Sequence, residues 1–190
     1  MIIELPGRTI MKPIRFYCPD CDFAHVGLPA ISRPYPDDIA TRINRVSTDR
    51  LRLGNDVCRI MYPKPRRSFI RANLDIPVID EAEPLQYGLW VELSERDFDQ
   101  YKRCERRNIP LILKGWLANE APDFPGTLGI PVQVVTRAFP LRPILQPAED
   151  DNDLWRAFEY GLEDWEAQLR MEISVLASAE PEDHSREDAA

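Results

Sequence analysis

The chain has 190 residues, a length that fits one ordinary domain with a tail. Hydrophobic residues make up 44% and charged residues 29%, which excludes a disordered, collagen-like or disulfide-dense protein. No apolar run approaches the roughly 20 residues that a membrane helix requires, and the opening lacks the unbroken apolar centre of a secretory signal. We therefore expect a cytoplasmic protein without a membrane segment, whose four cysteines are reduced thiols or metal ligands.

The net charge of −8 is distributed unevenly along the chain. Residues 1–75 carry 13 Lys and Arg against 8 Asp and Glu, whereas residues 146–190 carry 3 against 14. One interpretation is a solvated acidic C-terminal helix and tail. The other is a basic face that the acidic tail shields.

The predicted elements begin after an irregular N-terminal segment, residues 1–14. The stretch YPDDIATRINRV (35–46) predicts one short helix with Pro36 in its first turn. Apolar and polar residues then alternate over residues 56–62 and 68–79, which predicts two strands, and a third strand follows at residues 87–93. These strands are too close together for crossover helices, so this part of the sheet should be antiparallel.

The stretch SERDFDQYKRCER (94–106) predicts a second short helix, because Ser94 and Asp97 resemble a capping box. Further strands are expected at residues 111–117, 132–138 and 141–146. From Asp153 onward the pattern predicts one long helix, in which large apolar residues share a single stripe: Leu154, Phe158, Leu162, Trp165, Leu169, Ile173 and Leu176. Residues 179–190 are expected to form an acidic disordered tail.

Together these elements predict a single α+β domain over residues 15–178. Its core would be a mainly antiparallel sheet of about five to seven strands. The short helix after Ser94 and the long C-terminal helix would pack on that sheet.

The stretch CPDCDFAH brings Cys18, Cys21 and His25 within eight positions. The C-x-x-C spacing can deliver two thiolates to one zinc ion, but a structural zinc needs four ligands, and Cys58 is the candidate for the fourth. Free or buried thiols are the alternative interpretation. Redox chemistry is disfavoured, because aspartates flank both sulfurs and hinder their ionisation. No other cofactor is expected.

The motifs FYCPDCDFAHVGLP, NDVCRI, FIRANLDIPV, YGLWVELSERDFDQY, GWLANEAPDFPGTLG and LRPIL, in this order, resemble the bacterial domain-of-unknown-function family 2199 over roughly residues 15–145. The resemblance implies that Cys18, Cys21, His25 and Cys58 occupy the family's cysteine and histidine positions. Two departures stand out: Asp22 replaces a usual glycine, and AEDDNDLW lacks the family's later histidine. The resemblance implies no particular activity.

Sequence signals for catalysis are weak, so we expect a non-catalytic binding or interaction protein with a structural zinc knuckle as one option. Only His25 would fall in a folded site, and both the glycine-rich phosphate loops and the H-E-x-x-H motif are absent. The alternative is a small enzyme with a polar site made of Arg71, Trp90, Glu92, Trp116 and Asn119.

Partners are predicted from the length of the C-terminal helix. Residues 154–176 would extend roughly 35 Å, longer than one face of a domain of this size readily covers. Either the second half of the helix frays, or Leu169, Ile173 and Leu176 bury against a second copy or another protein. The one basic cluster, PKPRRSFIR, does not indicate a nucleic-acid partner, because the sequence pI is about 4.9.

Overall fold

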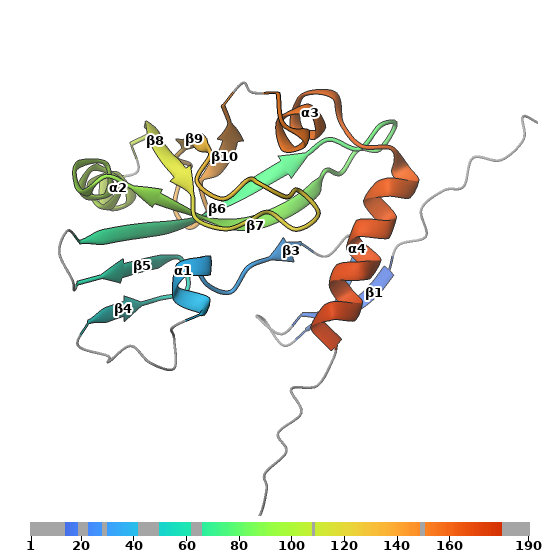
Figure 1. The fold of residues 1–190 in the computed structure, drawn as a ribbon, viewed down its shortest axis with the longest axis horizontal. Coiled ribbons are helices and arrows are strands. Elements are labelled where there is room, and N and C mark those ends of the chain that lie inside the picture. Colours follow the sequence, from blue (N-terminus) through green and yellow to red (C-terminus); the bar gives the residue numbers. More distant parts are fainter. Residues whose placement is uncertain are drawn as a thin grey trace, which may run out of the picture.

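The computed structural model describes residues 14–18, 23–27, 30–41, 50–61, 66–107, 109–148 and 151–179. The predicted irregular segment 1–14 and the predicted tail 179–190 lie almost wholly outside these residues, and so do residues 19–22, which include Cys21. The elements are, in chain order, β1 (Ile14–Cys18), β2 (Phe23–Gly27), β3 (Ile31–Ser32), α1 (Asp37–Ala40), β4 (Leu51–Leu53), β5 (Val57–Ile60), β6 (Arg67–Ile76), β7 (Leu85–Leu93), α2 (Glu95–Arg107), β8 (Ile112–Leu117), β9 (Pro131–Val135), β10 (Ile144–Pro147), α3 (Asp153–Tyr160) and α4 (Asp164–Ala179) (Figure 1).

Two long strands, β6 and β7, form the central hairpin of the larger sheet. They pair antiparallel from Ser68 opposite Leu93 to Ile76 opposite Leu85. Each of the two strands receives two partners along its outer edge. Strand β5 pairs with the first half of β6 and β10 with its second half, while β3 and β8 pair with the two halves of β7.

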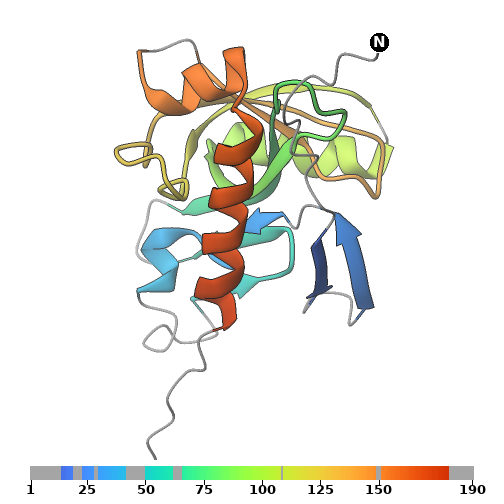
Figure 2. The ribbon, with the colours of Figure 1, turned by 90° about the vertical axis from the view of Figure 1, so that its right-hand side faces the viewer.

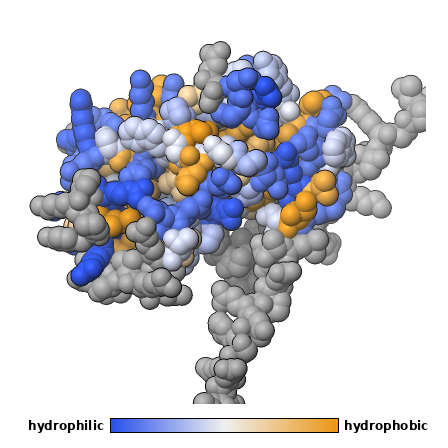
Figure 3. All heavy atoms as spheres, in the orientation of Figure 1, coloured by the Kyte–Doolittle hydropathy of each residue, from blue (hydrophilic) through white to orange (hydrophobic). Residues whose placement is uncertain are grey.

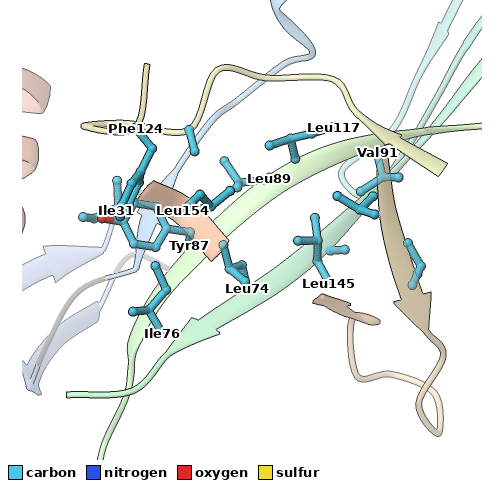
Figure 4. Close-up of a cluster of buried hydrophobic side chains, with 14 of the residues drawn as sticks. Ile31, Leu74, Ile76, Tyr87, Leu89, Val91, Leu117, Phe124, Leu145 and Leu154 are labelled. Carbon is cyan, nitrogen blue, oxygen red and sulfur yellow. The ribbon is translucent and has the colours of Figure 1, made fainter. Parts of the chain in front are cut away.

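The strands β6, β7, β8, β9 and β10 close into a five-stranded barrel. Neighbouring strands along β7, β8, β9 and β10 are antiparallel, and the barrel closes where β10 runs parallel to β6 at Ile144 and Asn73. Buried side chains from these strands fill the interior, with Leu74, Leu89 and Leu145 among them (Figure 4). Strands β3, β5 and β4 extend the sheet beyond the barrel to eight strands.

The predicted fold class, an α+β domain with a short helix and a long C-terminal helix packed on a mainly antiparallel sheet, is therefore wrong: five of the strands close into a barrel and the helices are short. The predicted strand ranges overlap the observed strands β5, β6, β7, β8, β9 and β10. Helix α2 begins directly after Ser94, as the capping box predicts, and the Asp97 amide donates to Ser94 Oγ over 3.1 Å. The parallel pairing of β10 with β6 closes the barrel, and it joins segments about seventy residues apart that no local pattern connects.

The long helix predicted over residues 153–178 is two helices, because the chain breaks at Gly161. Gly161 has φ 82° and ψ 171°, a conformation that is essentially restricted to glycine. The next residue, Leu162, leaves the helix path and exchanges backbone hydrogen bonds of 2.9 Å with Pro77 and Ile79 beside β6.

Among the described residues no helix is long and apolar enough to cross a lipid bilayer.

The break divides the predicted apolar stripe. Leu154 and Leu162 are buried in the barrel core. Helix α4 instead packs through Ala167 and Met171, on the opposite side from the later stripe residues. Figure 2 shows α4 crossing in front of the large sheet, with the β1–β2 hairpin as a separate pair of strands beside it.

A second, smaller hydrophobic cluster covers the outer face of the β6–β7 hairpin. Ile39 of α1 packs there with Phe69, Trp90 and Cys58. This cover explains why β6 is buried on both faces rather than alternating strictly between buried and exposed residues.

The substitution Gly161→Ala should destabilise the fold by about 3 kcal/mol, because alanine strains this backbone and its Cβ would lie 3.1 Å from the Pro77 carbonyl oxygen. Gly126→Ala is the matched control, since Gly126 also has positive φ but no atom within 4 Å of its added Cβ. Urea unfolding should give a loss of only about 1 kcal/mol for the control. Equal losses for the two variants would contradict this account of the break.

Candidate functional site

The five residues of the predicted polar site do come together. The ladder places Arg71 opposite Trp90 and Glu92 opposite Trp116, on the outer face of β6, β7 and β8. Asn119 follows β8 and accepts a hydrogen bond of 2.8 Å from the backbone amide of Trp90. Of the five, Trp116 is half exposed and not in the core.

Asn119 and Trp90 serve to hold the segment that leads into α1. The fully buried Asn119 donates hydrogen bonds of 2.8 Å from its Nδ2 to the Tyr35 carbonyl and to Asp37 Oδ1. The Trp90 indole donates to the Arg33 carbonyl over 3.1 Å. We call these contacts the Asn119 network. Through these contacts the oxygen and the nitrogen of the buried Asn119 amide both have hydrogen-bond partners within the protein.

Glu92 is likewise engaged by a neighbour. Arg67 binds its carboxylate with two hydrogen bonds, from Nε at 2.8 Å and from Nη2 at 2.7 Å. The third nitrogen of the same guanidinium bonds Asp38 of α1. The hydrogen bond to Glu92 is the largest reason why the pKa of Arg67 is raised above its ordinary value. The predicted polar site therefore ties α1 to the sheet.

Arg71 occupies a confined position on the same face. Arg71 is buried. Its Nε lies beside Gly88, the residue that pairs with Asn73, and a Cβ added at Gly88 would lie 3.7 Å from that nitrogen. The same Cβ would lie 2.6 Å from the Ser32 hydroxyl of β3. Glycine at position 88 is thus required for the close approach of β3 to β7.

The predicted metal ligands are distributed over two sheets. Cys18 is the last residue of β1, and His25 pairs with Phe16 across the β1–β2 hairpin, while Cys21 lies outside the described residues. Cys58 lies in β5, at the other end of the molecule from β1 in Figure 1. The structure does not bring Cys58 to the hairpin. Within the described ranges no group of three His, Cys, Asp or Glu side chains could hold a metal ion.

The Cys58 thiol has an apolar environment. It is fully buried in the cluster of Ile39, Phe69 and Trp90. Burial raises the pKa of Cys58 to about 12. A thiol in this environment is a packing group with little thiolate character.

A hollow of about 350 Å³ that sequence reasoning missed lies where the loop after β8 meets α3 and α4. Charged and aromatic side chains line it: Asp123, Asp153, Arg156, Tyr160, Glu166 and Arg170. Only the acidic character of the C-terminal region hinted at it, because the lining residues lie on three segments that the fold alone brings together.

The floor of the hollow is an arginine held between an aromatic ring and carboxylates. The Arg170 guanidinium lies 4.4 Å from the centre of the Phe124 ring, and its Nη2 donates to Glu166 over 2.7 Å. Phe124 in turn meets Tyr87 edge to face at 6.0 Å. Desolvation raises the pKa of the buried Tyr87 hydroxyl to about 12, and Arg170 and Asp123 are the next groups to act on it.

Helix α4 presents large apolar side chains to solvent beside this hollow. Trp165 is 67% exposed, Leu169 48% and Ile173 49%, and their spacing of four residues places them on one side of the helix. Figure 3 shows apolar side chains over α4 among hydrophilic neighbours. We call these three residues the α4 exposed face.

The fold and these surfaces define a small β-barrel protein with two C-terminal helices. The chain belongs to family DUF2199, described as uncharacterized proteins conserved in bacteria, whose model matches residues 17–162. This confirms the family predicted from the motifs. Comparison with curated proteins and with solved structures gave no match. Helix α4 begins at Asp164, so the α4 exposed face lies outside the matched residues.

Replacing Asn119 with alanine should lower the free energy of unfolding by about 3 kcal/mol, because the buried Trp90 amide loses its acceptor and two donor contacts disappear as well. Gln133→Ala, at an exposed position of β9, is the control and should change stability by less than about 0.5 kcal/mol. Denaturant titration measures both. A loss below about 1 kcal/mol for Asn119→Ala would show that the network does not hold α1.

Proposed function

We propose that this chain is a non-catalytic interaction protein of the cytoplasm that docks a protein partner through the α4 exposed face. The observation that carries the proposal is the exposure of Trp165, Leu169 and Ile173 on one side of a helix whose other side packs on the barrel. Contiguous exposed apolar groups of this kind commonly mark interaction sites.

The energetics of burial support this use of the helix. Covering a large apolar side chain completely contributes about 1.5–3 kcal/mol, so covering the remaining exposed half of three such residues contributes on the order of a few kcal/mol. Trp165 has the features of a binding anchor, because tryptophan is enriched among the residues that dominate interface affinity.

The enzyme alternative has less support from the contacts. The Asn119 amide bonds the Trp90 amide and the Tyr35 carbonyl, and Glu92 accepts two hydrogen bonds from Arg67, from Nε and Nη2. A general acid or base needs a carboxylate or imidazole that can reach a substrate proton. Glu92 and Asn119 of the predicted site instead form hydrogen bonds that hold parts of the fold together.

We further propose a structural zinc at the β1–β2 hairpin. Its support is the C-x-x-C spacing together with the hairpin register, in which β1 ends at Cys18 and β2 begins at Phe23, so that Cys21 falls in the connection and His25 soon after it. Two cysteines at the turn of a hairpin are a frequent half of a zinc site. The sequence suggested Cys58 as the fourth zinc ligand. Because Cys58 packs in an apolar cluster of the other sheet, we propose that another residue supplies the fourth ligand.

Elemental analysis of protein purified without a His tag should find about one zinc per chain, because the knuckle residues are all present. Cys21→Ser should lose the zinc, whereas Cys58→Ala should keep it and lose only packing stability. Zinc far below one equivalent in the unmodified protein would refute the zinc proposal. Loss of zinc in Cys58→Ala would instead make Cys58 the fourth ligand.

Placing the photo-crosslinking residue p-benzoylphenylalanine at position 169 of the full chain should give a discrete adduct in living cells, because a docked partner covers Leu169. Position 112 is the control, since Ile112 is even more exposed but lies on the outer side of the barrel strand β8. Mass spectrometry identifies the adduct, and the purified partner is then titrated against the unmodified chain and Leu169→Gln.

The interaction proposal predicts that Leu169→Gln weakens the reconstituted complex at least tenfold while the thermal midpoint stays within a few degrees. Crosslinks of equal yield at positions 169 and 112, or a partner that binds Leu169→Gln as tightly as the unmodified chain, would overturn it.

A further inference from the structure

We infer that the partner presents a basic amphipathic segment, whose apolar side chains cover the α4 exposed face while a Lys or Arg side chain enters the neighbouring hollow. This inference rests on the proposed function, and it specifies the chemistry of the partner that the proposed function leaves open.

The surface formed by α3 and α4 is acidic. Residues 151–174 contain seven Asp and Glu but only two arginines. Both arginines are already neutralised by neighbours: Arg156 by Asp151 and Asp153, and Arg170 by Glu166 and Asp123. The surface therefore has an unbalanced negative charge, which attracts a cationic segment and steers its approach.

The hollow itself combines charged side chains with an aromatic ring. Two arginines, Arg156 and Arg170, line the hollow and form ion pairs with Asp153 and Asp123. Asp151 and Glu166 also pair with these arginines, so four carboxylates surround two guanidinium groups and an excess of negative charge remains. Tyr160 forms part of the wall, and its ring is supported by an edge-to-face contact of 5.9 Å with Trp155. An ammonium or guanidinium group between an aromatic ring and carboxylates gains both cation–π and ionic attraction.

The hollow and the α4 exposed face are next to each other on the surface, because α4 contributes residues to both. Glu166 and Arg170 line the hollow from α4, and they alternate along that helix with Trp165 and Leu169 of the exposed face. A single extended or helical segment that covers the exposed face can therefore place one of its basic side chains in the hollow. The hollow, at about 350 Å³, is shallow and open to solvent, so a side chain of a segment lying on the surface can enter it.

A second copy of this chain is disfavoured as the occupant. In a twofold-symmetric pair of α4 helices, the acidic residues beside the exposed face, Glu166 and Glu172, would lie opposite the same acidic pair of the other copy. Each copy also carries a net charge of −8. Like-charge juxtaposition at an interface opposes association.

The probe is a synthetic 14-residue peptide of leucine and lysine, LKKLLKLLKKLLKL, with the leucine and glutamate peptide of the same pattern as its counterpart. Calorimetric titration of the full chain should give one site for the leucine and lysine peptide, with at least tenfold higher affinity than its counterpart. The double variant Leu169→Gln, Ile173→Gln should lose about tenfold in affinity without any change in charge.

The role of the hollow is tested by the double variant Asp123→Asn, Asp153→Asn, which should also weaken the leucine and lysine peptide about tenfold. Its matched control is Glu95→Gln, Asp99→Asn on α2, at the opposite end of the molecule from α4 in Figure 1. Both double variants change the net charge equally, so the control should lose less than twofold.

Three results would overturn the inference. Equal weakening by the two neutralised pairs would reduce the binding to general charge attraction. Tighter binding of a synthetic peptide of residues 1–13 than of the leucine and lysine peptide would make this chain's own N-terminal segment the occupant. An acidic partner, or a second copy, crosslinked at position 169 would also refute a basic partner, although it would leave the proposed docking role of α4 intact.

Discussion

The antiparallel ladder between β6 and β7 is the interaction on which the rest of the structure depends. Its nine residue pairs run without interruption from Ser68 and Leu93 to Ile76 and Leu85. Side chains on one face of the ladder fill the barrel, and those on the other face carry the Asn119 network and the small cluster around Trp90. Because the outer edges of both strands are shared by two further strands each, the ladder also fixes where the barrel closes and where the sheet extends.

The polar contacts that hold the fold together lie on the ladder, away from the surface that we propose for binding. Polar residues that look catalytic in the sequence, such as Glu92 and Asn119, lie on the hairpin and hold α1 against it. The hollow and the α4 exposed face lie instead where the C-terminal helices reach the barrel, and they combine residues of the matched family region with residues that follow it. In this arrangement the barrel is the scaffold, and α4, which follows the matched family region, carries the proposed docking face.

Local patterns predicted the elements well and their assembly poorly. Alternation placed β5 and β6, and the Ser94 capping box placed the start of α2, because each signal depends on neighbours in sequence. Barrel closure depends on the single parallel register of Ile144 and Asn73, which leaves no local trace. Gly161 ends helix α3 because of its φ and ψ. The helical periodicity continues on both sides of Gly161, so the sequence pattern predicted one helix instead of two. Trp116, predicted in the polar site, is half exposed because the alternation along β8 turns it outward and Leu117 inward. The hollow could not be predicted at all, since three separate segments form it.

The central claim is that the α4 exposed face is open in the isolated chain and covered in the complex that the protein forms. Carbene footprinting of the purified chain and of the crosslink-identified complex measures this for each side chain. The account predicts strong labelling of Trp165, Leu169 and Ile173 in the isolated chain, at least a threefold decrease in the complex, and no change at Ile112. Labelling of Leu169 and Ile173 in the isolated chain as weak as that of the buried Met171, or unchanged by the complex, would contradict it.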